Sequence, residues 1–266
     1  MIKAFYGLEK QPFSNQGIEL MPNQQEIYDT IKVHSYQGGL CLIIGEPGTG
    51  KSVIKEAIKE IDDKRMLVVS ISRTLHTYSN IIKILCEAFN VLDQGSNFKC
   101  EKRLIEAAYG IKREGKMLVV VIDEAHLLEM DTLRRLRLMF DDFPKNHNLV
   151  LIGQPDLMNK MYLKVNADIK SRVTYSVNMQ KLTPDQLEDF IFSQMDKVGL
   201  GHNTFTEDAI HLIVRSCEGT LRRARNLCLS CLLEAVRNRE KQINIAVVNS
   251  VLRMPHWRDE QDLNLS

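Results

Sequence analysis

The chain has 266 residues, with 35 basic and 34 acidic side chains, 44% hydrophobic residues and 6% aromatic residues. This composition predicts a soluble globular protein with one large domain, or one large and one small, and excludes disordered, collagen-like and disulfide-scaffold chains. The balanced charge neither indicates nor excludes a nucleic-acid partner, so that argument depends on local clusters.

Strands and helices are expected to alternate along the first two thirds of the chain, after an irregular N-terminal segment. Short apolar runs predict buried strands, and 117–122 gives the strongest signal because it is apolar throughout. This alternation predicts a parallel α/β sheet. The expected strands are 39–45, 66–71, 117–122 and 148–153, and the expected helices are 25–37, 51–61, 78–90, a helix that follows a polar loop over 93–99 and ends near 113, and 130–142.

Beyond residue 182 the sequence predicts helices only. Thr183 before Pro184 is typical of a helix start, with a capping hydroxyl followed by proline at the first helical position. The expected helices are 184–198, 206–217, 220–238 and 243–253. The predicted organisation is an N-terminal strap (1–24), an α/β domain (25–181), an all-helical domain (182–253) and a C-terminal tail (254–266). The tail is acidic and carries the only tryptophan, so it is either a loose end or a docking segment.

The cysteines and the termini indicate the compartment. Cys228 and Cys231 are the only closely spaced pair of six cysteines, and no second pair completes a zinc site. We therefore expect reduced core cysteines. No apolar run approaches the ~18 residues of a membrane span, and Met1–Phe5 lacks the apolar segment of a signal peptide. These features predict a cytoplasmic protein without a membrane segment.

The sharpest motif has the form G-x-x-x-x-G-K-[ST] and lies between a predicted strand and a predicted helix, as a P-loop requires. Glycines let backbone N–H groups turn toward phosphate oxygens, and the helix N-terminus adds a partial positive charge. In such a loop Lys51 reaches the β- and γ-phosphates and Ser52 is a ligand of Mg²⁺. The sequence therefore predicts ATP and Mg²⁺ as cofactors. The predicted nucleotide-binding residues here are Gly45, Glu46, Pro47, Gly48, Thr49, Gly50, Lys51, Ser52 and Val53.

Polar residues at the ends of two predicted strands complete the expected site. We expect Asp123 to hold the water shell of Mg²⁺ and Glu124 to orient and polarise the attacking water. His126 either links the site to a neighbour or is a buried histidine with satisfied hydrogen bonds. Gln154 is expected beside the γ-phosphate, with a turn residue before Pro155 as the alternative.

Two arginines stand at suggestive places, although spacing alone gives neither a role. Arg172 follows the last predicted helix of the α/β part, and Arg222 opens a helix of the all-helical part. A stray arginine is most often a solvated surface residue, but a P-loop site needs positive charge at the transferred phosphate.

Taken together, these motifs resemble an AAA+ ATPase. The segments Phe5–Ser14 and Leu151–Leu157 resemble the ExeA/GspA-like group in particular, and the resemblance covers about residues 5–253. That group includes the secretion ATPase ExeA and the transposition helpers TniB and TnsC, with MuB and IstB as more distant members.

The resemblance implies roles for the residues outside the P-loop. Gln154 corresponds to sensor 1, Arg172 to an arginine finger that acts on a neighbouring subunit's nucleotide, and Arg222 to sensor 2. Relatives often have proline before the sensor-2 arginine, where this chain has Leu221. Arg223 is therefore a second candidate for that role.

The resemblance also suggests a cellular function. ExeA-type proteins continue into a membrane span and a periplasmic domain, whereas this sequence ends at Ser266, which favours the transposition-type members. The expected function is an oligomeric regulator, as a ring or helical filament, that binds duplex DNA without sequence preference and recruits or activates a transposase while it hydrolyses ATP. Two alternatives stay open: a secretion or assembly ATPase that acts on proteins, and a scaffold in which hydrolysis only times disassembly. The Asp123–His126 motif also suggests a DEAH helicase, but 266 residues cannot supply the two RecA-like domains it needs.

Contacts to DNA are expected from two loops of the α/β domain, 72–76 and 97–103, because relatives wind around DNA with such loops. The alternative is the segment 215–241, which holds seven basic and three acidic residues, although a solvated helical surface explains that segment equally well. Lysine and arginine contacts to phosphates give affinity without sequence preference. The candidate DNA-binding residues in the loops are Arg73, His76, Lys99, Lys102 and Arg103.

Overall fold

A computed structural model of the chain describes residues 1–14, 19–61, 64–72, 77–145 and 147–257. The chain divides into two compact units, which we describe separately. The α/β unit comprises residues 18–46 and 50–179, and the helical unit comprises residues 1–17, 47–49 and 180–266.

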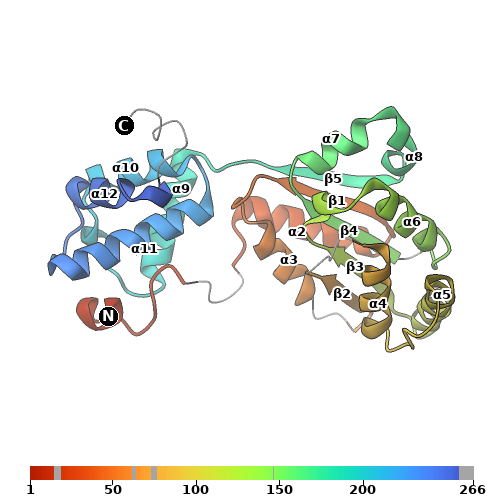
Figure 1. Cartoon of the computed structure of the whole chain (residues 1–266). Helices are drawn as coiled ribbons and strands as arrows, with labels where there is room; N and C mark the ends of the chain where they lie inside the picture. The colour runs from red at the N-terminus through yellow and green to blue at the C-terminus, as the bar shows by residue number, and fades with distance from the viewer. Residues whose placement is uncertain (15–18, 62–63, 73–76, 146, 258–266) are drawn as a thin grey trace. The chain divides into compact units, whose positions relative to one another are not determined.

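The α/β unit contains one sheet of five parallel strands in the order β2-β3-β4-β1-β5 (Figure 1). Because all strands run in the same direction, their carboxyl ends lie along one edge of the sheet. The predicted parallel α/β sheet is therefore confirmed. The strands are β1 (Gly39–Gly45), β2 (Met66–Ile71), β3 (Met117–Ile122), β4 (His147–Gly153) and β5 (Val173–Met179).

Helices cover both faces of this sheet (Figure 1). Alternate residues of the central strands point to opposite faces, so that Val120 packs with α4 to α8 while Val121 packs with α2 and α3. This burial on both faces explains why β3 is apolar throughout. The helices of this unit are α2 (Pro22–Ser35), α3 (Lys51–Lys59), α4 (Tyr78–Ala88), α5 (Asn97–Arg113), α6 (Met130–Asp141), α7 (Asp156–Tyr162) and α8 (Ala167–Lys170).

The helical unit is built from α9 (Pro184–Asp196), α10 (Glu207–Cys217), α11 (Leu221–Asn238) and α12 (Ile245–Leu252), with the N-terminal α1 (Ile2–Tyr6) beside α11. The predicted start of α9 is confirmed, because the Thr183 hydroxyl accepts a hydrogen bond from the Gln186 amide and Pro184 is the first helical residue. Cys217, Cys228 and Cys231 are free and lie in the core of this unit, as do Cys41, Cys86 and Cys100 in the α/β unit.

Three segments differ from the sequence-based expectations. Strand β5 was not predicted, because its residues alternate between partly buried and exposed positions at the sheet edge. Helix α1 forms within a segment expected to be irregular. It is too short to show helical periodicity, but its buried Ile2 and the left-handed Gly7 after its last residue favour it.

The third difference concerns residues 97–103, which were expected to form a DNA-contacting loop, with the helix beginning only after residue 99. They form the first two turns of α5, because Cys100, Leu104 and Ala108 recur every four residues and pack into the core. The segment 97–103 therefore presents a helix surface rather than a loop.

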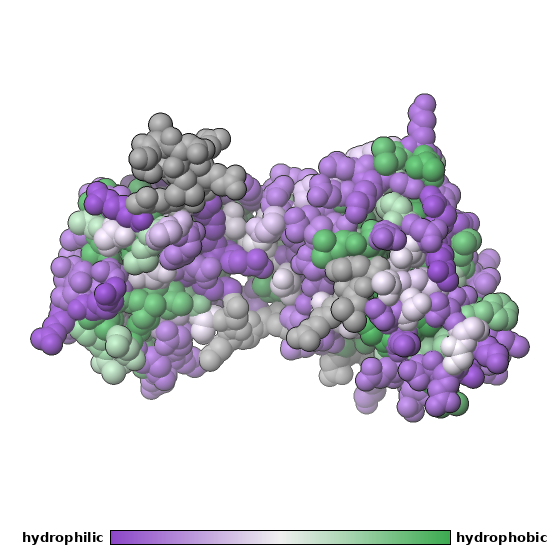
Figure 2. Space-filling model, viewed as in Figure 1, coloured by the Kyte–Doolittle hydropathy of each residue, from purple (hydrophilic) through white to green (hydrophobic). Residues whose placement is uncertain are grey.

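On the face shown in Figure 2, hydrophilic residues predominate on both units, and hydrophobic residues form separate patches. Among the described residues, no helix is both long enough and apolar enough to cross a membrane.

Candidate nucleotide-binding site

The sheet topology brings the P-loop, the acidic pair Asp123 and Glu124, and Gln154 to one edge. Strand β4 lies between β3 and β1, and its Gly153 pairs with Ile44 of β1. Gln154, which follows Gly153, therefore lies between the start of the P-loop and the acidic pair at the end of β3. The carboxyl ends of three adjacent strands thus form the candidate site.

The P-loop backbone has the curvature that phosphate binding requires. Gly48 has φ 85° and Gly50 has φ 100°, values in the left-handed region that residues with a Cβ rarely adopt. Helix α3 begins directly after Gly50. The buried Lys51 donates hydrogen bonds from its ammonium to the carbonyls of Gly45 (2.7 Å) and Glu46 (2.9 Å), which holds its charge at the loop.

The acidic pair is held by backbone geometry and by a neighbouring lysine. The Asp123 amide donates to the Ile71 carbonyl of β2 (3.0 Å), and Asp123 Oδ1 accepts from the Glu124 amide (2.9 Å). Asp123 Oδ2 is 3.0 Å from the Lys55 ammonium, in a pair whose side chains are each 11% exposed. Burial acts to lower the pKa of Lys55, but its bonds to Asp123 and Glu56 outweigh burial and leave this pKa raised.

Glu124 and Asp123 have different surroundings, which fits the different roles expected of them. Glu124 has φ 52°, a left-handed conformation that is uncommon outside glycine, and its side chain is about half exposed. Asp123 is 8% exposed. The Glu124 carboxylate is open to solvent, whereas the Asp123 carboxylate is held by Lys55 and the Glu124 amide.

His126 is buried and close to the acidic pair. Its Nδ1 lies 3.6 Å from Glu124 Oε2 and has no hydrogen-bond partner among the described residues, while its carbonyl accepts from Lys160 (2.6 Å). A Cβ at Gly153 would lie 3.2 Å from the His126 amide nitrogen, so the end of β4 packs closely on this segment. Because Nδ1 has no such partner, the ring does not fit the second alternative, a buried histidine with satisfied hydrogen bonds.

The donor set fits Mg²⁺, which prefers oxygen ligands. Ser52 is exposed in the first turn of α3, and Asp123 supplies a carboxylate from β3, so the two oxygens come from rigid elements. Ser52 and Asp123 are therefore the residues that would hold the ion.

Arg172 lies at the opposite edge of the sheet. It directly precedes β5, whose register with β1 runs from Val173 opposite Leu40 to Met179 opposite Gly45. A seven-residue strand is roughly 23 Å long at ~3.3 Å per residue. Arg172 is thus about one strand length away from the P-loop of its own chain.

Arg172 is the last residue of a row of alternating charges. Its guanidinium is 3.7 Å from Asp141, which also pairs with Arg137 at 2.9 Å. Arg137 is 3.8 Å from Asp168, which pairs with Arg134 at 3.4 Å. This row connects α6 and α8 to the start of β5. Sequence reasoning missed it, because only the fold brings residues 134–141, 168 and 172 together.

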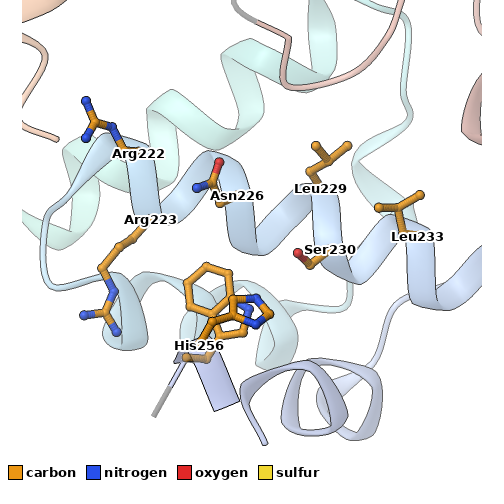
Figure 3. A pocket seen from close by; sticks show the side chains of 8 residues that line it. Arg222, Arg223, Asn226, Leu229, Ser230, Leu233 and His256 are labelled. Carbon is orange, nitrogen blue, oxygen red and sulfur yellow. The ribbon is translucent and has the colours of Figure 1, made fainter. Parts of the chain in front are cut away.

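In the helical unit, Arg222 and Arg223 lie in the first turn of α11 (Figure 3). Their side chains leave the helix in different directions (Figure 3). Both border an open groove of about 420 Å³ whose other lining residues are Asn226, Leu229, Ser230, Leu233, His256 and Trp257. Within this unit, which includes residues 47–49, the Arg222 amide donates to the Gly48 carbonyl (3.4 Å), and a Cβ at Gly48 would lie 3.1 Å from the Arg222 Cβ, so Arg222 is the arginine in contact with the P-loop.

The candidate DNA-binding residues fall into three groups. Arg73 and His76 lie outside the described residues. Arg103 donates to the carbonyls of Leu92 (2.9 Å) and Gln94 (2.7 Å), so its guanidinium holds the preceding loop. Lys99 and Lys102 are exposed near the start of α5.

Comparison with known proteins agrees with a nucleotide-binding site at the carboxyl ends of the strands. Residues 33–161 match the family model described as an AAA domain. General secretion pathway protein A of Aeromonas hydrophila is 24% identical over 98% of this chain and 50% of its own length, so the chain spans half of that relative.

Two solved structures share the fold. Cdc6p of Pyrobaculum aerophilum has a TM-score of 0.69 and 20% identity over 87% of this chain and 67% of its own. The ORC1 protein of Aeropyrum pernix, solved in complex with DNA, has a TM-score of 0.68 and 18% identity over 90% of this chain and 67% of its own.

The fold, the site and the matched domain define the class of protein. It is an ATPase with a P-loop AAA+ fold. Within that class, residues 33–161 match the AAA domain model, and the chain is similar to the secretion protein A and to the Cdc6 and ORC proteins.

Proposed function

We propose that this protein is an oligomeric ATPase that assembles on duplex DNA and recruits or activates a transposase. In this proposal residues 25–181 bind the nucleotide and residues 182–253 form a helical lid with Arg222, or Arg223, as sensor 2. The observation that carries the oligomeric step is the position of Arg172 at the edge of the sheet opposite the P-loop. A finger at that edge is suited to the nucleotide of a neighbouring copy rather than to its own.

In the proposed reaction, water attacks the γ-phosphate of ATP and the β–γ bond breaks. Mg²⁺ at Ser52 and Asp123 would neutralise part of the phosphate charge. Lys51 binds the β- and γ-phosphates, and the half-exposed Glu124 orients the water and takes up its proton. Gln154 lies where it can bond the γ-phosphate.

DNA binding is supported by one feature of the α/β unit. Lys99 and Lys102 are exposed at the N-terminal end of α5, where the helix dipole adds to their positive charge, and Phe98 beside them is 75% exposed. One subunit would offer only two or three phosphate contacts. Copies in series would multiply these contacts and give cooperative binding without sequence preference.

The transposase partner is supported by the resemblance of the sequence to transposition helpers. The alternative is a secretion or assembly ATPase that acts on protein partners, which the match of 98% of this chain to the secretion protein A favours. DNA binding separates the two functions. Duplex binding that requires ATP and weakens steeply with salt supports the first, and no binding at any salt concentration supports the second.

Mixing two inactive variants tests the shared site. Arg172→Ala lacks the finger but keeps its P-loop, and Lys51→Ala has the reverse defect. If Arg172 acts on a neighbour, mixed assemblies should regain part of the parental phosphate release. No recovery at any ratio, in mixtures shown to co-assemble, would mean that Arg172 serves its own chain or is structural.

A further inference from the structure

Lys55 occupies an unusual place for a lysine, next to the carboxylate expected to serve Mg²⁺. It lies one helical turn after Lys51 on α3, and its ammonium is 3.0 Å from Asp123 Oδ2. The other Asp123 oxygen accepts from the Glu124 amide at 2.9 Å. Both oxygens of Asp123 are therefore engaged inside the chain.

The ion pair of Lys55 with Asp123 is more buried than the ion pair of Lys59 with Glu56 on the same helix. The side chains of Lys55 and Asp123 are each 11% exposed, so water screens their attraction weakly. Lys59 pairs with Glu56 at 3.0 Å, but these side chains are 44% and 41% exposed. The two lysines offer a matched comparison, because both belong to α3 and both pair with a carboxylate, but only Lys55 pairs with Asp123.

We propose that Lys55 is a positioning residue for Asp123 that competes with the divalent cation and sets the Mg²⁺ concentration that nucleotide binding requires. The proposal rests on the proposed Mg²⁺–ATP site. Lys55 neutralises Asp123 in the described state, and a divalent cation at the same carboxylate repels the ammonium. The ion can therefore bind fully only when Lys55 withdraws.

Glu56 gives Lys55 a place to withdraw to. Its Oε1 lies 3.3 Å from the Lys55 ammonium, whereas its Oε2 bonds Lys59. Lys55 contacts both carboxylates, so a change of side-chain conformation can release Asp123 while the contact to Glu56 is kept, and the ammonium does not become an unpaired buried charge. Binding of a metal ion at Asp123 would therefore shift the Lys55 ammonium toward Glu56 on α3.

The test measures metal affinity directly. A fluorescent ATP analogue is held at fixed concentration, and its binding is followed while MgCl₂ is titrated, with Mn²⁺ detected by electron paramagnetic resonance as a second readout. Lys55→Met should lower the half-saturating metal concentration about tenfold, since a competing cation is removed. Lys55→Arg keeps the charge and should stay at the parental value or above it. Lys59→Met removes the same charge from the same helix and should leave it unchanged.

The outcomes separate this inference from the proposed function. Metal-dependent nucleotide binding by the parent protein with no gain in Lys55→Met overturns the inference alone. An equal gain in Lys59→Met also overturns it, because the effect would then be one of net charge. If the parent protein binds nucleotide with neither Mg²⁺ nor Mn²⁺, both the inference and the proposed function are overturned. Should Lys55→Met fail to fold by circular dichroism, Lys55→Gln, whose amide can still donate to Asp123, takes its place with the same expected direction.

Discussion

The two edges of the sheet are built for different tasks. At the carboxyl edge, Lys51 and Asp123 are each 8% exposed and are bonded within the chain. At the amino edge, the Arg172 side chain is 55% exposed and its pairing distance to Asp141 is a long 3.7 Å. The side chains at the first edge are buried and held by hydrogen bonds, whereas the guanidinium at the second edge is exposed and weakly paired. In the function proposed above, Arg172 at the second edge of one copy would complete the nucleotide site at the first edge of a neighbouring copy.

The largest expected loss of nucleotide binding follows from a change at the carboxyl edge. Lys51→Ala removes the cation that the P-loop carbonyls hold at the loop, so the phosphates lose their main positive partner. ATP affinity measured by calorimetric titration should fall by about a hundredfold or more, as the loss of a charge-assisted, poorly solvated contact implies. Lys59→Ala, an exposed lysine of the same helix, serves as the control. Parental affinity in Lys51→Ala would contradict the P-loop assignment.

The second prediction separates binding from chemistry at the same edge. Glu124→Gln keeps the shape of the side chain but removes the carboxylate, so ATP should bind normally while hydrolysis falls roughly 10²- to 10⁴-fold. The variant should also accumulate as the ATP-bound assembly. Glu129→Gln, just before α6, is a control for charge. Phosphate release at the parental rate in Glu124→Gln would assign the catalytic base to another residue.

The contrast between the buried centre and the edge of the sheet also explains which parts of the fold the sequence predicted. The buried strands and the P-loop carry strong local signals, an apolar run or a glycine pattern, and each was placed to within a residue or two. Strand β5 mixes Thr174, Ser176 and Asn178 with apolar residues, and this alternation of an edge strand was not read as a strand. Pairings such as Lys55 with Asp123 join residues 68 positions apart, so no local pattern contains them.

The third prediction tests whether the exposed face of α5 belongs to the functional surface. Replacement of Lys99 and Lys102 by alanine should weaken binding of a labelled duplex about tenfold at low salt and reduce the salt dependence, because phosphate contacts are lost in every subunit. ATP binding should be unchanged. Fluorescence anisotropy across a salt series, with a slowly hydrolysed ATP analogue, measures both quantities.

The matched control for this prediction removes the same charge from the other end of the helix. Lys112→Ala with Arg113→Ala should leave DNA affinity near the parental value. Equal weakening by both double variants would indicate a general charge effect. Unchanged affinity in the Lys99 and Lys102 variant would place the DNA contacts elsewhere, first in the basic segment 215–241.

The smallest expected effect concerns how Arg172 is held at the amino edge. Asp141 lies between Arg137 and Arg172, so Asp141→Asn removes the charge that draws the finger toward α6. Exposed ion pairs contribute little individually, so ATP hydrolysis by the assembled protein should fall only about two- to fivefold. Nucleotide affinity of the separated subunits should stay the same, because Asp141 is on α6 and far from the P-loop edge. Asp142→Asn, at the next and exposed position, should have no effect. A loss as large as that of Arg172→Ala would mean that Asp141 stabilises the edge itself rather than the orientation of its arginine, and an equal loss in Asp142→Asn would attribute the effect to net charge.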